Sequence, residues 1–428
     1  MIVNIRNEKG MVLIVSYLVI AVLLTFSLIF VSRSFNTSRV TQRYNDLTLA
    51  FNLAEAGLDR GLGWLRNQPV PPAGVAPINV FINVALGQGT YSVVITPDAG
   101  NPASFIDKYT IASTATVRGT SRTLINDVQV DSFARYIYFS NVENFNSTNV
   151  WFWDLDALNG RVQTNAHFNI AGRPLFDGAV ASADTYIRFY NNGSNINVSG
   201  PSNLPFDNPD FRQGIDFGAP RITMPSRALD LRGAAAAGGY NPNGNTTIVL
   251  NCDGTMNTTN GGTTVNNRPL PANGAIFVRN GNLTVSGCMN GQLAMGAERD
   301  IIINNNIVYA DDPRTNPSSD DILGLVAERD IMISSGAPFN MQIDATVMAL
   351  DTSFYVQNWA SIAAKGTLSL YGGIIQKERG PVGTFNWNTR TKVSGYSKNY
   401  RYDNRLLTNP PPFFPTTGDY VSLSWREG

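Results

Sequence analysis

The stretch NEKGMVLIVSYLVIAVLLTFSLIFVSR, from Asn7 to Arg33, decides how the rest of the chain is interpreted. Its central part, Met11 to Val31, carries no charged residue and is long enough for a transmembrane helix of about 20 residues. A cleavable secretion signal has an apolar core of only about 7–15 residues, followed by a small-residue cleavage site. Because no such site follows this segment, we expect a retained membrane-spanning helix.

The helical pattern continues beyond the membrane segment. Apolar and aromatic residues recur at steps of three and four, at Val40, Tyr44, Leu47, Phe51, Ala54, Leu58, Leu62 and Leu65. The prolines at 69, 71 and 72 then end the run. The pattern predicts one helix from Met11 to Arg66, with a transmembrane part at 11–31 and an amphipathic stalk at 32–68. The apolar stripe of the stalk needs a protein partner.

Three alternating runs follow the prolines and predict a small antiparallel meander within residues 69–133. They are TYSVVI (90–95), KYTIASTATV (108–117) and SRTLINDVQV (121–130). A sheet of about three strands is unstable with one apolar face bare. We therefore expect this sheet to pack on the stripe of the stalk from Leu47 to Leu65.

Three N-terminal features occur together: a leader at residues 1–10 that ends in Gly10, the apolar helix directly after it, and a short motif. The motif is LAEAGL, made of Leu53, Ala54, Glu55, Ala56, Gly57 and Leu58. Together they resemble type IV prepilins, in particular PilX-like minor pilins and the related pseudopilins. The resemblance implies a long helix with a sheet against its outer half, and cleavage by a prepilin peptidase between Gly10 and Met11. Most pilins carry a glutamate five residues past the cut, where this chain has Val15.

Residues 134–428 contain an internal repeat. The sequence AERDIII at 297–303 returns as AERDIMI at 327–333, and looser echoes place Ala349 and Ala364 at the position of Ala297 and Ala327. Strand, polar corner and strand, repeated with insertions, predicts a parallel β-solenoid in which each turn buries apolar residues against its neighbours. An irregular β-sandwich is the alternative. The predicted fold class is thus mainly β with one long N-terminal α-helix.

Composition argues against several classes of function. Lys plus Arg equals Asp plus Glu at 32 each, so no net charge favours a nucleic-acid partner. The single histidine, His167, excludes a multi-histidine metal site and is more typical of a partly buried structural residue than of a catalytic triad. We expect no cofactor and no enzymatic activity.

Two further sets of residues leave alternatives open. Cys252 and Cys288 would be able to form a disulfide outside the cytoplasm, or would be two small buried thiols. Four carboxylates flank one loop and are weak candidates for calcium ligands: Asp311, Asp312, Asp320 and Asp321. That loop lacks the alternating acidic spacing of a calcium loop, so a solvated insertion is the default interpretation.

The repeated Glu298 and Glu328 would suit the paired carboxylates of a carbohydrate-active enzyme built on a β-helix. The arginine after each of them favours exposed, ion-paired corner residues instead.

The leading hypothesis is a minor pilin or pseudopilin-like component of a type IV pilus or type II secretion-like assembly, which primes or caps the fibre and displays a β-rich head. Its partners would be other pilin subunits, the inner membrane and the prepilin peptidase. It would span the inner membrane once before assembly, with its C-terminal domain extracytoplasmic, and later sit at the fibre tip. The alternative is a membrane-anchored adhesin that recognises a surface glycan or another cell, with candidate contacts at Trp151, Trp153, Tyr186, Phe189 and Tyr190.

Processing between Gly10 and Met11 is directly testable. In cells with an active prepilin peptidase, mass spectrometry of the mature N-terminus should find Met11 as the first residue, because the charged leader ends where the apolar span begins. An intact leader in such cells would return the chain to the class of plain membrane anchors.

Overall fold

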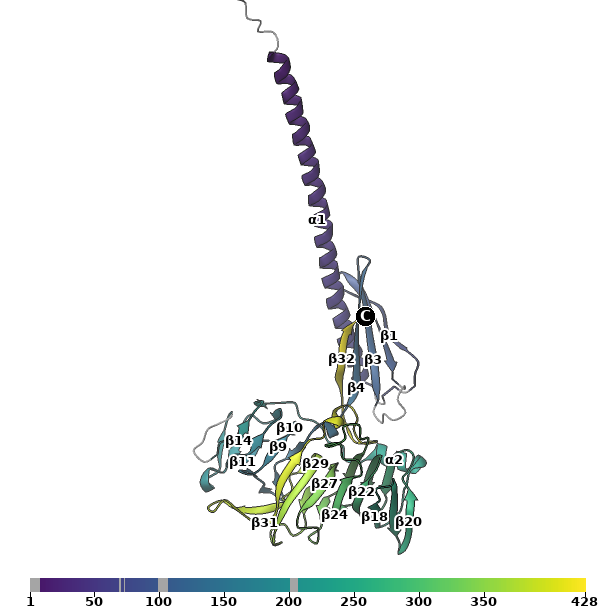
Figure 1. The fold of residues 1–428 in the computed structure, drawn as a ribbon, viewed down its shortest axis with the longest axis vertical. Helices are drawn as coiled ribbons and strands as arrows, with labels where there is room; N and C mark the ends of the chain where they lie inside the picture. The colour runs from purple at the N-terminus through teal and green to yellow at the C-terminus, as the bar shows by residue number, and fades with distance from the viewer. Residues whose placement is uncertain (1–7, 69–70, 73, 99–106, 201–206) are drawn as a thin grey trace, which may run out of the picture. The chain divides into compact units, whose positions relative to one another are not determined.

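The computed structural model describes residues 8–428 except 69–70, 73, 99–106 and 201–206 (Figure 1), so the leader residues 1–7 lie outside it. The chain is mainly β with one long N-terminal helix, α1 (Glu8–Arg66). It divides into two compact units. Unit 1 comprises Met1–Ala99, Lys108–Gln129 and Tyr420–Gly428, and unit 2 comprises Gly100–Asp107 and Val130–Asp419.

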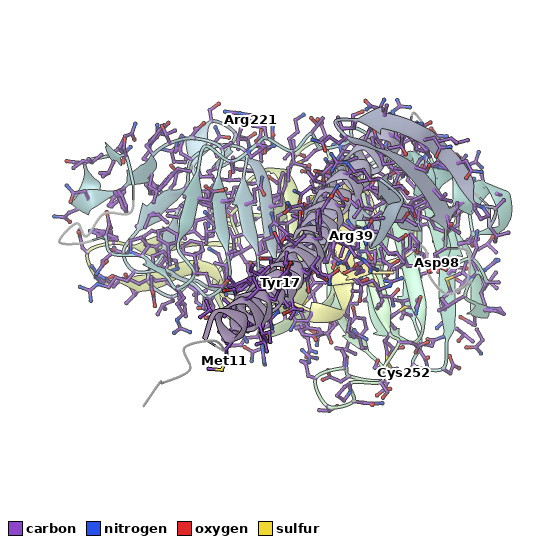
Figure 2. All side chains as sticks on the ribbon, turned by 90° about the horizontal axis from the view of Figure 1, so that it is seen from above. Met11, Tyr17, Arg39, Asp98, Arg221 and Cys252 are labelled. Atoms are coloured by element: carbon purple, nitrogen blue, oxygen red, sulfur yellow. A yellow bond between two sulfur atoms is a disulfide. The ribbon has the colours of Figure 1, made fainter. Side chains whose placement is uncertain are left out.

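Helix α1 is 59 residues long, and its described end at Arg66 is the predicted one. Its first half packs against no other described part of unit 1, since Met11 and Tyr17 are 68% and 70% exposed. Figure 2 shows the side chains of this half standing out around the helix. Among the described helices, α1 has the length and composition to cross a membrane. The apolar character of this half therefore has no explanation within unit 1.

The second half of α1 packs on a five-stranded sheet with the order β1-β2-β3-β4-β32. The strands are β1 (Ile78–Leu86), β2 (Gly89–Pro97), β3 (Lys108–Val117), β4 (Thr120–Ser132) and β32 (Thr416–Glu427). The pairs β1–β2, β2–β3 and β3–β4 are antiparallel. Strands β2, β3 and β4 are the predicted meander, whereas β1 and β32 were not predicted.

The sheet packs on the predicted part of the stalk stripe, from Leu47 to Leu65. Ala54, Leu58 and Leu65 are buried, but Val40 and Tyr44 are 55% and 67% exposed. The sheet explains the difference, because it covers the helix only from about Asp46 onward.

Two glycines set how closely α1 approaches the sheet. A Cβ atom added at Gly57, within the LAEAGL motif, would lie 2.2 Å from Ser113 Oγ. One added at Gly61 would lie 2.9 Å from both Ile111 Cγ2 and Val93 Cγ1. Since no larger residue fits without a shift, these glycines allow the backbone of the helix to lie directly on β2 and β3.

The last strand corrects the predicted domain boundary. Residues 134–428 were expected to form one domain, but β32 runs beside β4 in unit 1. The Gly428 N–H donates to the Thr123 carbonyl at 2.9 Å, and Ser422 Oγ donates to Asn126 Oδ1 at 2.6 Å. Unit 2 is therefore inserted between two adjacent strands of the sheet of unit 1.

Unit 2 is built mainly from short strands in parallel ladders. One ladder contains, in spatial order, β21 (Ala275–Val278), β23 (Gln292–Ala297), β25 (Ile322–Ala327), β27 (Met341–Ala349), β29 (Ala364–Glu378), β5 (Tyr138–Val142), β10 (Val162–Thr164), β13 (Val180–Ser182) and β17 (Ile215–Phe217). A continuous apolar row runs along it through Ile276, Met295, Leu325, Val347, Ile374, Tyr138, Val162, Val180 and Ile215.

A second ladder contains β18 (Thr246–Leu250), β22 (Leu283–Met289), β24 (Ile301–Tyr309), β26 (Ile331–Ile333) and β28 (Phe354–Val356). Here the predicted register is confirmed, because Ile301 pairs with Ile331 and both side chains are fully buried. Ala297, Ala327 and Ala349 also align as expected. The expectation for Ala364 was wrong: Gln376 pairs with Ala349, since β29 is long enough to serve two ladders.

A third ladder begins at the C-terminal ends of β22 and β24 and the N-terminal ends of β27 and β29. It continues through β31 (Thr391–Arg401), β9 (Ala157–Asn159), β12 (Leu175–Phe176) and β16 (Asp210–Phe211).

Smaller elements complete unit 2. Strands β8 (Phe152–Trp153), β11 (Asn169–Ala171) and β14 (Ile187–Phe189) pair in parallel, and β15 (Ile196–Val198) is antiparallel to β14. Short hairpins are β6 (Asn144–Phe145) with β7 (Thr148–Asn149), and β19 (Thr255–Asn260) with β20 (Thr263–Pro269). The turns η1 (Phe133–Arg135), η2 (Asn191–Gly193) and η3 (Asn404–Leu407) and strand β30 (Gly383–Asn386) lie between them in sequence.

The order of strands in space differs from their order in the chain. Unit 2 begins at β5 in the middle of the stack and extends outward to β17, and the later strands fill the other side from β21 back to β29. In Figure 1, yellow β29 lies beside green β27, and β5 separates β29 from teal β10 on its other side. The first and last parts of unit 2 therefore meet, where Ile374 of β29 pairs with Tyr138 of β5.

Residues 218–232 carry the chain from one half of this stack to the other. Asn165 holds Ile222 through both backbone groups, with Ile222 N–H donating to Asn165 Oδ1 at 2.9 Å. Farther along, α2 (Leu229–Gly238) presents Arg232 to Glu298 and Glu328 at 3.3 and 3.0 Å. The crossing segment is thus fixed to both halves of the stack.

Replacing Gly57 by leucine should loosen unit 1, because the side chain would have to displace Ser113 on β3. Overpacking of this kind costs about 1–3 kcal/mol. Hydrogen exchange measured by mass spectrometry should therefore show β3 amides of Gly57→Leu exchanging about tenfold faster or more.

Gly63→Leu is the matched control, since a Cβ added at Gly63 meets nothing within 4 Å. It gains the same helix propensity, so its β3 amides should stay protected as in the unmodified chain. Equal exchange in the two variants would contradict the close helix–sheet approach.

Candidate functional site

Unit 2 contains a cleft of about 470 Å³. Its walls come from segments far apart in sequence: residues 145–153, Tyr190, Trp359 and residues 380–398. The first and last of these segments directly follow β5 and β29. The cleft therefore lies at the seam where the beginning and the end of unit 2 meet.

Tryptophans dominate the lining. Of the six in the chain, Trp151, Trp153, Trp359 and Trp387 line the cleft. Trp153 is stacked on Phe385 with ring centroids 4.5 Å apart. Of these four, only Trp153 lies on a strand, and the other three lie in turns or loops.

The rings also hold one another in place. Tyr190 packs against Trp151 at 5.5 Å and against Trp387 at 5.1 Å. The Trp387 Nε1–H donates to Asn192 Oδ1 at 2.8 Å, and the Arg390 guanidinium lies 4.9 Å from the Trp387 ring centroid. The aromatic wall is therefore fixed before any ligand arrives.

A buried charge cluster supports the same wall. The Arg379 side chain is 4% exposed and donates to Glu143 Oε2 at 3.0 Å and to the Trp151 carbonyl at 3.1 Å. Lys398 donates to Asp156 Oδ2 at 2.6 Å. Breaking such a buried pair by removing one partner costs about 3–5 kcal/mol, so these charges fix the local backbone.

Two lysines line the cleft, and their surroundings differ. Burial lowers the pKa of Lys398, although its partner Asp156 acts in the opposite direction. Burial also lowers the pKa of Lys392, whose ammonium group donates to the carbonyls of Lys365 and Gly366. Lys392 thus brings a positive charge to the cleft, where its ammonium group is hydrogen-bonded to backbone carbonyl oxygens.

Of the aromatic residues singled out in the sequence, Trp151, Trp153 and Tyr190 line the cleft. Phe189 is fully buried in the core, and Tyr186 is stacked on His167 at 4.5 Å. Sequence reasoning missed Trp359, Phe385 and Trp387, which lie in loops and hairpins with no periodic pattern.

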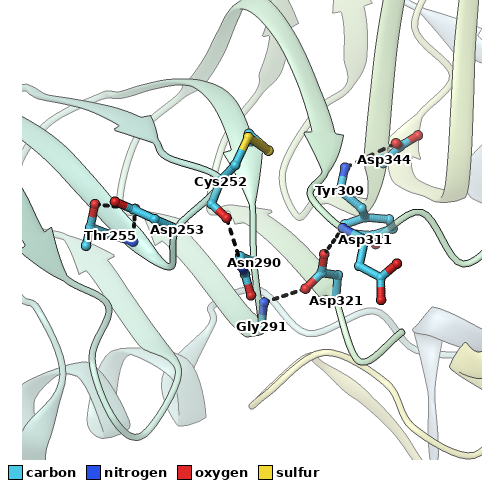
Figure 3. The surroundings of a disulfide bond; sticks show 10 residues. Cys252, Asp253, Thr255, Asn290, Gly291, Tyr309, Asp311, Asp321 and Asp344 are labelled. Atoms are coloured by element: carbon cyan, nitrogen blue, oxygen red, sulfur yellow. Dashed lines mark hydrogen bonds between the residues drawn. A yellow bond between two sulfur atoms is a disulfide. The ribbon is translucent and has the colours of Figure 1, made fainter. Parts of the chain in front are cut away.

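The two cysteines form a disulfide that joins neighbouring strands at one side of the stack (Figure 3). Cys252 follows β18 and Cys288 lies on β22, the strand that pairs with β18 in parallel. Their Cα atoms are 4.8 Å apart, and the bond closes a sequence separation of 36 residues.

The carboxylates considered as weak calcium candidates contact other groups of the protein. Asp321 accepts hydrogen bonds from the N–H groups of Gly291 and Asp311 at 2.5 and 2.8 Å (Figure 3). Asp312 pairs with Arg314 at 2.7 Å, and Asp320 is exposed. Within the described parts of the chain, no three His, Cys, Asp or Glu residues come together as a metal site.

Glu298 and Glu328 are ion-paired as expected, but with a different partner. Both contact Arg232 of α2 and not the arginine that follows each of them. Glu328 is also buried and not exposed. The sequence could not indicate Arg232, because the crossing segment brings it from a distant part of the chain.

The LAEAGL motif lies at the contact between α1 and its sheet: Leu53, Ala54, Gly57 and Leu58 face the sheet, and Glu55 is exposed. Gly10 and Met11 lie in the first turns of α1.

Comparison with known proteins gives limited information. Residues 105–185 match the family model described as "Domain of unknown function (DUF4900)", which covers less than half of the chain. None of the curated proteins matches. Among solved structures, the competence-associated pilin ComZ from Thermus thermophilus aligns with 12% identity and a TM-score of 0.29, over 90% of this chain and 97% of that one. A TM-score this low does not establish a shared fold.

His167 offers a clean test of the electrostatics of unit 2, since it is the single histidine of the chain. Burial lowers its pKa below the ordinary value of 6.5, although Asp184 lies 3.1 Å from its Nδ1. The folded chain thus binds fewer protons than the unfolded chain just below pH 6.5. The free energy of unfolding should fall as the pH drops through 6.5, and His167→Asn should lack this component.

Nuclear magnetic resonance of the histidine-labelled chain measures the same quantity directly. One resonance should titrate with a midpoint below 6.5. A midpoint above that value would mean that the pairing with Asp184 outweighs burial.

Proposed function

We propose that this chain is a minor pilin or pseudopilin-like structural component of a type IV pilus or type II secretion-like assembly. The observation that carries the proposal is the division of α1. Its first half exposes apolar side chains on all sides, and its second half lies through glycines on an antiparallel sheet. An uncovered apolar helix needs lipid before assembly and other helices afterwards.

We further propose that unit 2 is a parallel β-solenoid displayed on the extracytoplasmic side of the inner membrane. Apolar rows that pass from strand to strand along each ladder support the solenoid. The Cys252–Cys288 disulfide supports the location, because such bonds persist in oxidising compartments. The role proposed for this head is structural display and binding, without catalysis.

The subunit would prime or cap the fibre at low copy number. Val15 replaces the acidic residue through which most pilins pair with a neighbouring subunit. Unit 2 also adds Val130–Asp419 to a stem whose helices must pack side by side. Such bulk is difficult to repeat along a shaft, whereas a terminal subunit has free space on one side.

Quantitative mass spectrometry of sheared fibres, combined with immunogold labelling of unit 2, tests this proposal. The expected result is a small fraction of the copies of the main subunit, with label at fibre ends. Label along the whole shaft at a comparable copy number would overturn the terminal position. Absence of the chain from fibres and from their membrane assembly complex would overturn the pilin-like role itself.

A further inference from the structure

We propose that the aromatic cleft of unit 2 binds a carbohydrate chain, with sugar rings stacked on the indole rings of Trp151 and Trp387. This inference concerns unit 2 alone and does not depend on the pilin-like role of the helix. It gives the displayed head a ligand class.

The size and the walls of the cleft suit such a ligand. Its volume of about 470 Å³ lies within the range of small-molecule sites, about 300–1,000 Å³. Trp151 and Trp387 are only partly buried, and each packs on Tyr190. Because the apolar C–H faces of a pyranose ring pack well on flat aromatic rings, the wall offers stacking positions already in place.

Besides the two lysines, the remaining lining supplies uncharged hydrogen-bonding groups. Asn146, Asn149, Thr384 and Ser397 line the cleft beside the rings, and each carries both donor and acceptor capacity. Sugar hydroxyls have the same dual capacity. Aromatic faces interleaved with uncharged polar groups therefore match the two kinds of surface that a sugar presents.

The charges near the cleft favour a saccharide over the other ligands that stack on aromatic rings. Arg379, Lys398 and Arg390 are each paired with a carboxylate, at Glu143, Asp156 and Asp154. A nucleic acid requires a continuous basic track for its phosphates, which these neutralised groups do not form. The described lining contains lysine but no Asp or Glu, so a cationic ligand would gain only the ring faces. Lys392 is compatible with neutral sugars and with the carboxylates of acidic ones.

The test uses the full chain in detergent micelles, titrated with defined probes: cellohexaose, chitohexaose, a galacturonic acid hexamer and a thymidine oligonucleotide of similar length. Tryptophan fluorescence and saturation-transfer nuclear magnetic resonance report binding. We expect at least one of the three saccharides to bind, with its ring protons receiving saturation from the protein. Trp387→Ala and Trp151→Ala should each weaken that binding by about tenfold, the value of one aromatic contact.

Two further variants separate recognition from folding. Trp387→Phe keeps an aromatic face on the same hairpin and should weaken binding less than Trp387→Ala. Trp425→Ala removes an indole that is 48% exposed in unit 1, outside the cleft, and should bind like the unmodified chain. Thermal unfolding of each variant verifies that unit 2 is intact.

Three results would overturn the proposal. One is no binding of any of the three saccharides up to about 10 mM, a concentration that detects even weak sites. Another is binding of the oligonucleotide alone, which would assign the cleft to single-stranded nucleic acid. The third is saccharide binding that folded Trp151→Ala and Trp387→Ala retain in full. Each of these leaves the fibre experiment unaffected, so failure of the ligand proposal is distinguishable from failure of the pilin-like role.

Discussion

The parallel pairing of β5 with β29 is the constraint on which unit 2 depends. It joins the first strand of the unit to one of its last, with Ile374 beside Tyr138 and Gln376 beside Ser140. The buried Arg379–Glu143 pair lies just past the ends of these two strands and links residues 236 apart in sequence. The third ladder crosses the same seam, where Tyr400 of β31 pairs with Leu158 of β9. Without these two pairings, the apolar rows would end as two half-stacks, each with an open edge.

The same seam explains why the aromatic cleft lies where it does. Residues 145–153 follow β5, and residues 380–398 follow β29, so the two segments leave the pairing side by side. Aromatic rings of one segment pack against those of the other, as in the stacking of Trp153 on Phe385. A buried ion pair beneath a ring wall is costly to assemble, but once formed it fixes the wall in one arrangement. A fixed wall favours the proposed binding role, because a ligand meets rings that need no rearrangement.

The sequence predicted the elements whose pattern is local. Helix α1 was visible because its apolar residues recur over many turns, and Ile301 with Ile331 because the repeat is nearly identical. It did not predict β32 in unit 1. The alternation in TTGDYVSLSWRE is compatible with a strand, but nothing local indicates that its partner is β4, which lies almost 300 residues earlier in the chain. Trp387 and Trp359 were missed for a similar reason: the cleft exists only after distant loops meet.

The meeting of the two ends of unit 2 has a consequence for biosynthesis. A chain made from its N-terminus completes β5 long before β29, which must wait for about as many residues as separate Glu143 from Arg379, namely 236. At the usual elongation rate of about 5–20 residues per second, the open edge of β5 would stay unpaired for about 10–50 s. An unpaired strand edge is a template for aggregation. Folding during synthesis therefore favours a chaperone that holds the early strands until β29 has been made.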